Sequence, residues 1–432
     1  MIAVLDLVYA LLAIGFLISC LWLFYNVPIA AVGVRQLRKN KQKSNGEKIG
    51  AEKLPVFSVV VPAKNEGKVI GRLLDALSRL NYPKDRVEVI VVEDGSTDKT
   101  VEICRRFANE RLLNLRILQK ACSDGKPSAL NLAIKHATGD IVGFFDADSV
   151  PDMDVLLKAA EYFGDVQVAA VQGRTYSINS DENMLTKLLS HEETVWFEAY
   201  LRGRDVLRLF VHLKGSCQFV RREVLEELNG FDESALSEDM EISAKLVKKD
   251  YGIRYGPDVV SWEECPSSWR QLFKQRIRWF RGCIEVGFKY GSLIRKPGRR
   301  TLDAETTFFG PLTLIVSLAT YLAAFGAVFV PFSLSPLVQC VMNLAALAFT
   351  GTLILCGLAL IYASKPRKMR NLLWIPFLYV YWNVQAFIAV YAMLCIGLRR
   401  RRRWVKTDKT GVVATDNPDC LIALRVPEAK CD

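Results

Sequence analysis

The chain has 432 residues, of which 51% are hydrophobic, and a formal net charge of +11 at pH 7. This length accommodates one sizeable globular domain together with several membrane segments. The basic excess lies beside apolar runs, within 35–53, 289–300, 365–370 and 399–409. This placement favours membrane anchoring over nucleic-acid binding. The 11 cysteines include no Cys-x-x-Cys pair, so neither a zinc site nor a disulfide framework is expected.

The first predicted element is a transmembrane helix over residues 7–34. Asp6 precedes this apolar run and a basic stretch follows it, which is the reverse of the charge order in a signal peptide. The positive-inside rule then places the amino terminus outside the cell membrane and residue 35 onward in the cytoplasm. Residues 39–53 are expected to form a polar linker.

From residue 55 onward, strand patterns and helix patterns alternate. Apolar runs typical of buried parallel strands occupy 56–61, 87–92, 115–118 and 141–145. Amphipathic, helix-like stretches lie between and after them, at 67–80, 97–107, 128–136 and 153–163. The alternation predicts an α/β fold with a doubly wound, Rossmann-like sheet in a cytoplasmic domain over 55–265. A ligand is expected at the carboxyl ends of its strands.

Polar motifs follow three of the predicted strands, at 62–66, 93–98 and 146–148. Taken singly each motif is weak, because Asp-Gly-Ser is a common turn and Asp-x-Asp arises often by chance. Their joint placement after successive strands predicts convergent acidic side chains. Such a set is suited to Mg²⁺ or Mn²⁺, which proteins bind through one or two carboxylates and substrate phosphates.

Two stretches read as amphipathic helices for a membrane surface. Residues 267–290 alternate apolar and basic side chains, although a solvated charged face over an ordinary core would give the same pattern. Residues 184–210 predict a second such helix, with aromatic side chains for the interface and basic ones for lipid headgroups, namely Trp196, Phe197, Arg202, Arg204 and Arg208.

The ordered motifs resemble those of the processive, membrane-integrated glycosyltransferases of family 2. These are inverting nucleotide-sugar enzymes of the cellulose, chitin, hyaluronan and poly-N-acetylglucosamine synthase type. The resemblance covers 55–290 and is carried by segments 59–66, 91–98, 125–131, 146–148, 237–239 and 275–279. It implies a GT-A fold, a UDP-sugar donor, a divalent metal, and transfer to a growing β-linked polysaccharide that passes through the membrane helices.

The resemblance also implies roles on the donor side of the site. It assigns Asp146 and Asp148 to the metal, and Asp239, beside Glu238, to the general base that takes the acceptor proton. The residues expected to bind the nucleotide sugar are Pro62, Ala63, Glu66, Asp94, Lys126, Asp146 and Arg278. Without the family match, an exposed surface lysine would be the simpler reading of Lys126.

On the acceptor side, the resemblance points to a helix and a strand. Gln275, Arg278 and Trp279 share one helical face, where a guanidinium matches a diphosphate and an indole stacks on a pyranose. The resemblance assigns Gln275 and Trp279 to the acceptor. It adds Gly215 and Ser216, in segment 214–219, for which an ordinary buried strand is the alternative.

The membrane half begins near residue 308. Residues 308–332 and 337–362 predict a transmembrane hairpin, after which the basic segment 365–370 returns to the cytoplasm. If 372–398 also crossed, the arginines at 399–403 would lie outside, against the positive-inside rule. This stretch is therefore expected at the cytoplasmic face.

Segment 404–411 resembles the cytoplasmic gating loop of cellulose and hyaluronan synthases, which inserts over the bound nucleotide. The residues that carry this match are Trp404, Lys406, Thr407 and Lys409. A basic tail that holds a membrane end is the alternative. Residues after 411 are expected to be unstructured.

The function expected from the sequence is extension of a β-linked polysaccharide by a membrane enzyme. The alternative within enzymes is transfer of one sugar to a lipid, as in ceramide glucosyltransferase. A catalytically silent glycan-binding membrane partner is a third reading, but such relatives usually lose a carboxylate of the set. The partners are therefore a UDP-sugar, a polysaccharide or glycolipid acceptor and the lipid bilayer, and no nucleic acid is expected.

Overall fold

The structure is a computed structural model that describes residues 2–39, 54–110, 114–120, 122–291, 298–327, 336–364, 367–402, 406–415 and 417–424. Most of the predicted linker 39–53 and residue Trp404 lie outside these residues. The chain divides into two compact units. The sheet unit comprises 42–190, 210–272 and 403–432, and the helical unit comprises 1–41, 191–209 and 273–402.

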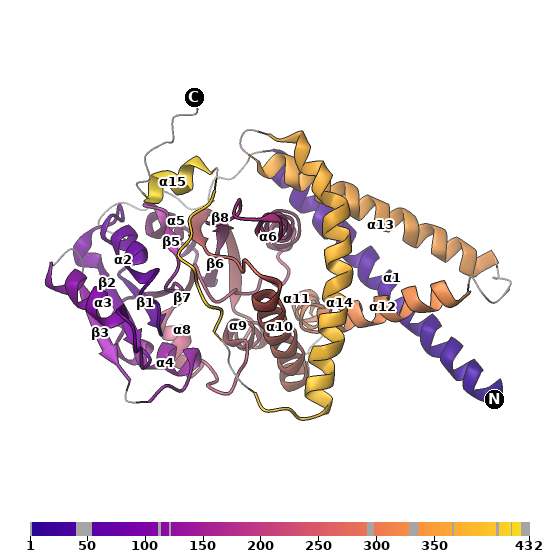
Figure 1. Ribbon diagram of the computed structural model, residues 1–432, viewed down its shortest axis with the longest axis horizontal. Coiled ribbons are helices and arrows are strands. Elements are labelled where there is room, and N and C mark those ends of the chain that lie inside the picture. Colours follow the sequence, from indigo (N-terminus) through magenta and orange to yellow (C-terminus); the bar gives the residue numbers. More distant parts are fainter. Residues whose placement is uncertain are drawn as a thin grey trace. The chain divides into compact units, whose positions relative to one another are not determined.

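The sheet unit is built on one eight-stranded mixed sheet of order β3-β2-β1-β4-β7-β6-β8-β5 (Figure 1). The four predicted strands are present and parallel, as β1 (Phe57–Ala63), β2 (Val87–Glu93), β3 (Leu115–Gln119) and β4 (Ile141–Phe144). The central strands β1, β2 and β4 are buried on both faces, which explains why they read as unbroken apolar runs.

The second half of the sheet turns antiparallel. β7 (Gln218–Arg221) runs antiparallel to both β4 and β6 (Val168–Ser177). β8 (Gly252–Glu263) pairs in parallel with β6, and β5 (Val150–Pro151) closes that edge. The predicted doubly wound sheet is thus confirmed in its first half and becomes mixed in its second.

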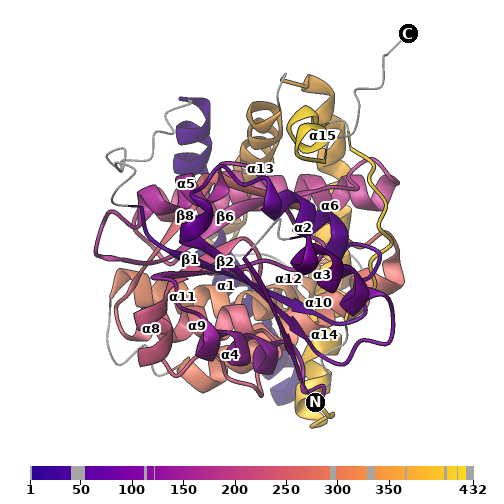
Figure 2. The same ribbon diagram turned by 90° about the vertical axis from the view of Figure 1, so that its left-hand side faces the viewer.

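Helices cover both faces of this sheet. α2 (Ile70–Ser78) and α3 (Thr100–Asn109) lie on one face and α4 (Lys126–His136) on the other, as Figure 2 shows. The unit is completed by α5 (Val155–Tyr162), α8 (Arg222–Glu227) and α9 (Glu238–Lys248). Between sheet and helices, Phe219 packs edge-to-face against Phe57 and Phe145, with ring centroids 6.0 and 5.7 Å apart. Such contacts fix the strand ends that carry the polar motifs.

The C-terminal segment ends in a helix, so the expectation of an unstructured tail after residue 411 is wrong. α15 (Pro418–Leu424) belongs to the sheet unit and contacts α2 and β5. Cys420 and Ala423 are buried in an apolar cluster, and Arg79 donates to the carbonyl of Ala423 at 2.6 Å. These buried apolar side chains and the Arg79 hydrogen bond hold the C-terminal helix on the sheet unit.

The helical unit contains long apolar helices. Three described helices are long and apolar enough to cross a membrane, over Ala13–Arg38, Met342–Ala363 and Met369–Gly397. They belong to α1 (Ile2–Arg38), α13 (Pro336–Ala363) and, with the short η5 (Met369–Trp374), α14 (Ile375–Gly397). α11 (Arg299–Phe308) and α12 (Gly310–Ala327) precede them. The described part of α12 is a shorter apolar helix.

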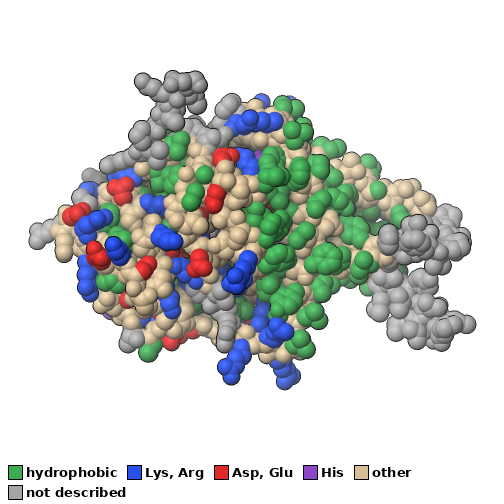
Figure 3. Space-filling view, in the orientation of Figure 1, with side chains coloured by type: hydrophobic (Ala, Val, Ile, Leu, Met, Phe, Trp, Pro, Cys, Tyr) green, Lys and Arg blue, Asp and Glu red, His purple; other side chains and the backbone are tan. Residues whose placement is uncertain are grey.

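Within this unit α14 runs across the direction of α12 and α13 (Figure 1). Hydrophobic side chains gather over α14, with basic ones at its lower end (Figure 3). Phe377, Val380, Phe387, Tyr391 and Leu394 are exposed on it. A contiguous apolar face of this kind marks a surface for lipid or protein contact.

The predicted interfacial helix 184–210 is divided into α6 (Met184–Val195), the π-helix η3 (Trp196–Leu201) and α7 (Arg202–Val206). The prediction that Phe197 faces the membrane interface, and Arg202 and Arg204 the headgroups, is wrong, because all three side chains are buried. Arg202 pairs with Glu198, and Arg204 lies 3.1 Å from Asp303. A guanidinium withdrawn from water requires such a carboxylate partner.

Candidate active site

A buried lysine connects the carboxylates at the end of the sheet. The Lys126 ammonium lies 2.8 Å from Asp146 Oδ1 and 2.9 Å from Glu238 Oε1, and it donates to the Gly215 carbonyl at 3.1 Å. Burial alone would lower the pKa of Lys126, but Asp146 and Glu238 outweigh it and hold that pKa above its usual value. Lys126 therefore stays charged and is no surface lysine.

Asp239 lies at the start of α9 beside this lysine. Its Oδ1 accepts hydrogen bonds from the Ser237 hydroxyl at 2.7 Å and the Met240 N–H at 2.8 Å. Burial, and then the charge of Glu238, raise the pKa of Asp239 above its usual value. A carboxylate with a raised pKa is a better proton acceptor than an ordinary one, which suits a general base.

Gly215 lies next to Asp239 and Lys126, and its lack of a side chain leaves space beside them. Its φ of +83° is a conformation that favours glycine, and a Cβ there would lie 3.3 Å from both Asp239 Oδ2 and Lys126 Nζ. The predicted acceptor-facing segment 214–219 is thus a turn that leads into β7, and its first half is not a strand.

Two buried glutamines hold this turn, and sequence reasoning missed both. The Gln172 Oε1 accepts the Lys214 N–H at 2.7 Å, while the Gln218 Oε1 accepts the Gly215 N–H at 3.0 Å. Ser216 supports the neighbouring loop, because its hydroxyl accepts the Asp146 N–H at 3.2 Å. The residue types carried no signal for these roles, because glutamine in a strand is uninformative without its partners.

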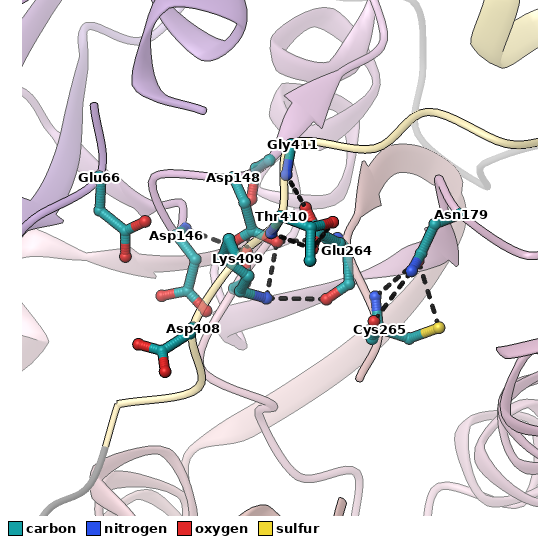
Figure 4. A network of polar contacts seen from close by, with 12 residues as sticks. Glu66, Asp146, Asp148, Asn179, Glu264, Cys265, Asp408, Lys409, Thr410 and Gly411 are labelled. Carbon is teal, nitrogen blue, oxygen red and sulfur yellow. Dashed lines mark hydrogen bonds and ion pairs between the residues drawn. The ribbon is translucent and has the colours of Figure 1, made fainter. Parts of the chain in front are cut away.

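Asp148 is buried and has two partners. The Lys409 ammonium lies 2.8 Å from its Oδ2, and the Glu264 N–H donates to the same oxygen at 2.7 Å (Figure 4). Burial alone would raise the pKa of Asp148. Lys409 and the Glu264 N–H outweigh burial and hold this pKa below its usual value. Asp148 is therefore an anion that needs a cation beside it.

Three of the residues predicted to bind the nucleotide sugar, Pro62, Ala63 and Asp94, lie at the ends of β1 and β2. Pro62 and Ala63 end β1, and the Asp94 N–H donates to the Ala63 carbonyl at 3.0 Å. The Asp94 carboxylate accepts the Ser123 hydroxyl at 2.7 Å and pairs with Lys120 at 3.0 Å. Lys120 and Ser123 were not predicted, because no motif marks the loop that carries them.

Glu66 lies in the loop that follows β1 and contacts the C-terminal segment. The Lys406 ammonium lies 2.9 Å from Glu66 Oε1 and donates to the carbonyls of Lys64 and Asn65 at 2.7 and 2.6 Å. Burial raises the pKa of Glu66 to about 7, although Lys406 acts in the opposite direction. Thr407, between the two docked lysines of this segment, is half-buried.

Gln275, Arg278 and Trp279 lie on α10 (Trp269–Tyr290), in the part of that helix that belongs to the helical unit. Their neighbour Arg276 is held by α6, with its Nη2 2.5 Å from Glu192 Oε2, and its guanidinium lies 4.4 Å from the centre of the Trp279 ring. The Gln385 amide of α14 donates to the other Glu192 oxygen at 2.6 Å. The predicted helix is confirmed, and the roles of Gln275, Arg278 and Trp279 stay predictions.

The donor set at Asp146 and Asp148 fits a divalent metal that is completed by substrate. Among the described residues, no group of three or more His, Cys, Asp or Glu side chains forms an all-protein metal site. Asp146 keeps 38% of its side chain exposed, and each of the two carboxylates has an ammonium beside it. Two carboxylates plus phosphate oxygens are the usual arrangement for Mg²⁺.

In a sheet that opens in parallel order, ligands bind at the carboxyl ends of the strands, which is where the acidic loops of this chain lie. The family model described as "Glycosyltransferase like family 2" matches residues 55–282. The chain belongs to this family.

Three curated proteins illustrate its relatives. A probable glycosyltransferase of Bacillus subtilis, YdaM, is 31% identical over 298 residues, which cover 68% of this chain and 71% of that protein. A beta-monoglucosyldiacylglycerol synthase of Nostoc is 34% identical over 249 residues, 56% of this chain and 52% of the relative. A poly-beta-1,6-N-acetyl-D-glucosamine synthase of Staphylococcus epidermidis is 29% identical over 231 residues, 53% of this chain and 55% of the relative. The chain thus spans about half the length of the last two.

Among solved structures, a mannosyltransferase from Pyrobaculum calidifontis in complex with GDP-Man and Mn²⁺ superimposes with a TM-score of 0.58. It is 24% identical, and the match covers 90% of this chain and 100% of that one. This likeness shows the fold, which is GT-A. The chain is therefore a glycosyltransferase with a GT-A fold.

Proposed function

We propose that this protein transfers a sugar from a UDP-sugar, with inversion, to the hydroxyl of an acceptor held at a membrane. One observation carries the proposal. Asp239, a buried carboxylate with a raised pKa, faces the same Gly215 turn as the Lys126 ammonium that pairs with Asp146. A base for the acceptor and a cation for the donor are thus neighbours.

In the proposed reaction Asp239 takes the proton of the acceptor hydroxyl as that oxygen attacks the anomeric carbon. The nucleoside diphosphate leaves from the opposite face, so one displacement inverts the carbon. The Lys126 ammonium would neutralise the leaving anion, and Asp146 and Asp148 would hold a divalent metal beside it. When bound, that metal supplies positive charge to the departing diphosphate.

The first acceptor that we propose is a growing β-linked polysaccharide. Support comes from the ordered motifs of 59–66, 146–148, 237–239 and 275–279, and from the C-terminal segment seated on Asp148 through Lys409. In this reading, residues 406–411 cover the nucleotide during transfer, and the exposed apolar helices keep the polymer beside the bilayer.

A second acceptor is a lipid with a free hydroxyl, such as diacylglycerol. The observation that favours it is the 34% identity to the Nostoc beta-monoglucosyldiacylglycerol synthase. A lipid would reach the site along the same membrane surface, so the two acceptors call for the same chemistry and differ in product size.

The experiment uses full-length protein in lipid nanodiscs, supplied with radiolabelled UDP-glucose, UDP-N-acetylglucosamine or GDP-mannose, with and without diacylglycerol. We expect label to pass from a UDP-sugar to a β-linked product. A product that lengthens with time identifies the polymer, and a single lipid-soluble species identifies the glycolipid. Transfer from GDP-mannose alone, or an α-linked product, would contradict the proposal.

The matched variant for this experiment is Asp239→Asn. It keeps the shape of the side chain and removes the base, so we expect turnover to fall by about 10²- to 10⁴-fold. UDP affinity, measured by calorimetry, should stay close to that of the parent protein. Unimpaired turnover would remove Asp239 from its role.

A further inference from the structure

Glu264 lies between the proposed metal ligand Asp148 and the C-terminal segment. Its backbone and side-chain polar groups form hydrogen bonds with both. It follows β8 directly and is only 4% exposed. Its backbone N–H donates to Asp148 Oδ2 at 2.7 Å, and its backbone carbonyl accepts the Lys409 ammonium at 2.7 Å (Figure 4). The backbone of one residue therefore contacts both partners of the Asp148–Lys409 ion pair.

The side chain of Glu264 holds the two residues that follow Lys409. Its Oε1 accepts the Thr410 N–H at 2.6 Å and the Thr410 hydroxyl at 2.9 Å, and its Oε2 accepts the Gly411 N–H at 3.0 Å. Successive backbone N–H groups that converge on one anion form a concave binding site of known type. The φ of +82° at Gly411 belongs to this turn.

This carboxylate is compensated by the segment and by one neighbouring arginine. The Arg72 guanidinium lies 3.6 Å from Glu264 Oε2 and donates to the Asp148 carbonyl at 3.2 Å. A buried carboxylate is stable only when its oxygens are hydrogen-bonded or paired. Release of Thr410 and Gly411 would leave Glu264 Oε1 without the donors that it has in this structure, so the docked position is favoured.

Lys409 is carried onto Asp148 by this docking. Its Nζ lies 2.8 Å from Asp148 Oδ2, and its side chain is 17% exposed. A divalent metal bound to that oxygen would stand at about 2.0–2.6 Å from it. A lysine ammonium at hydrogen-bond distance from the same atom would then repel the metal strongly, because two cations would share one partly buried oxygen.

We infer that Glu264 is a positioning residue for the C-terminal segment: it seats Lys409 on Asp148 as a tethered cation that a divalent metal has to displace. The inference rests on the proposed role of Asp148 as a metal ligand. The segment then has two positions. In the free enzyme Lys409 sits on Asp148, and when metal and nucleotide sugar arrive Lys409 leaves Asp148 and residues 406–411 move to cover the nucleotide. Metal entry and movement of residues 406–411 are one coupled event.

The first arm of the test measures how firmly the segment is seated, by amide hydrogen exchange of full-length protein in nanodiscs without metal. We expect Glu264→Gln to raise exchange across 406–415 by at least tenfold, because an amide cannot accept from all three donors. Glu227→Gln, an exposed carboxylate on α8, is the control and should leave this exchange unchanged. Exchange as slow in Glu264→Gln as in the parent protein would overturn the inference.

The second arm measures Mn²⁺ affinity by electron paramagnetic resonance in the presence of UDP. We expect both Lys409→Gln and Glu264→Gln to tighten Mn²⁺ binding several-fold. The result for Glu264→Gln is decisive, because loss of a nearby negative charge would by itself weaken cation binding. Weaker or unchanged Mn²⁺ binding in both variants would overturn the competition between Lys409 and the metal.

Two further variants keep the outcomes distinct. If Glu264→Gln does not fold, Gly411→Ala disturbs the same turn, since its Cβ would meet the Lys68 carbonyl at 3.3 Å in a conformation that favours glycine. It should raise exchange and tighten Mn²⁺ binding in the same way. Asp148→Ala should abolish Mn²⁺ binding. If it does not, the proposed metal site fails, whereas loss of binding there with no effect of Lys409→Gln rejects only the present inference.

Discussion

Gly215 shows how one backbone position limits what the catalytic side chains can do. A Cβ at this position would lie 3.3 Å from Asp239 Oδ2 and from Lys126 Nζ, and the φ of +83° disfavours any other residue. We expect Gly215→Ala to cost about 1–2 kcal/mol of folding stability and to lower turnover sharply, because the added methyl group crowds the proposed base Asp239 and Lys126.

The control for Gly215→Ala is Gly230→Ala. Gly230 also has a positive φ, of +63°, and its Cβ would meet the side chain of Asn131, which hydrogen-bonds the Phe231 carbonyl and Glu233. Both variants should melt at lower temperature, measured by calorimetry. Only Gly215→Ala should lose turnover per folded molecule, and equal losses in the two would reduce Gly215 to a structural role.

Glu238 contributes to the raised pKa of the proposed base Asp239. After burial, the negative charge of Glu238 is the next cause that raises the pKa of Asp239. Glu238→Gln removes that charge, so the pKa of Asp239 falls and a larger fraction is deprotonated in acid. The acid limb of the turnover profile should therefore move to lower pH, which a pH–rate series measures. A shift to higher pH, or none, would show that Glu238 acts otherwise.

At the scale of elements, α14 poses a question of topology that its length does not answer. Residues 54–190 and 406–424 belong to one folded unit, so in a chain that spans a membrane they lie on the same side of it. The chain between them must therefore cross an even number of times. Because α14 runs across α12 and α13 in Figure 1, we expect the hairpin of α12 and α13 to cross and α14 to lie along the cytoplasmic surface.

Labelling of single cysteines in sealed, right-side-out cells measures this topology. The background lacks the exposed Cys122 and Cys340. An impermeant maleimide should then label a cysteine at Ser333, between α12 and α13, and should not label one at Asp419 in α15 until the cells are opened. Labelling of the Asp419 position from outside would place three crossings in this region and reject the surface position of α14.

The elements differ in how well local sequence predicts them. β1 to β4 were predictable because each is an unbroken apolar run of a few residues, and α2 to α5 because their apolar positions repeat at helical spacing. β6 and β8 were missed, since the two strands pair across about 80 residues and neither carries a local signal as clear. Strand propensity reflects only the local sequence, whereas β6 and β8 are stabilised by pairing with each other.

The candidate site shows the same division. The carboxylates at 94, 146 and 148 lie in motifs that follow predicted strands, so the pattern identified them, whereas Asp239 was identified by the family resemblance. Glu264 carries no such mark, because its partners Thr410 and Gly411 lie 146 and 147 residues away in the chain. The burial of Arg204 was missed for a related reason, since the pattern of its own helix does not reveal Asp303 on α11.

At the scale of the whole molecule, the C-terminal segment links catalysis to stability. Truncation after Leu398 removes both the Lys409 contact and α15, so we expect turnover to fall more than donor affinity, as for a closing element, and the sheet unit to melt earlier. A stop after Thr415 is the matched control. This variant lacks α15, so its melting temperature should fall. Because it keeps residues 406–415, its turnover per folded molecule should stay higher than that of the shorter variant. Equal activities would separate the segment from catalysis.

The docking of residues 406–424 onto the sheet unit has a consequence for biosynthesis. The loop after β1 leaves the ribosome early, yet its partner Lys406 is about 340 residues later in the chain, after the apolar helices α12, α13 and α14. Contacts of such long range form late in folding. The nascent chain therefore carries carboxylates without their lysine counter-ion until the membrane helices have been synthesised.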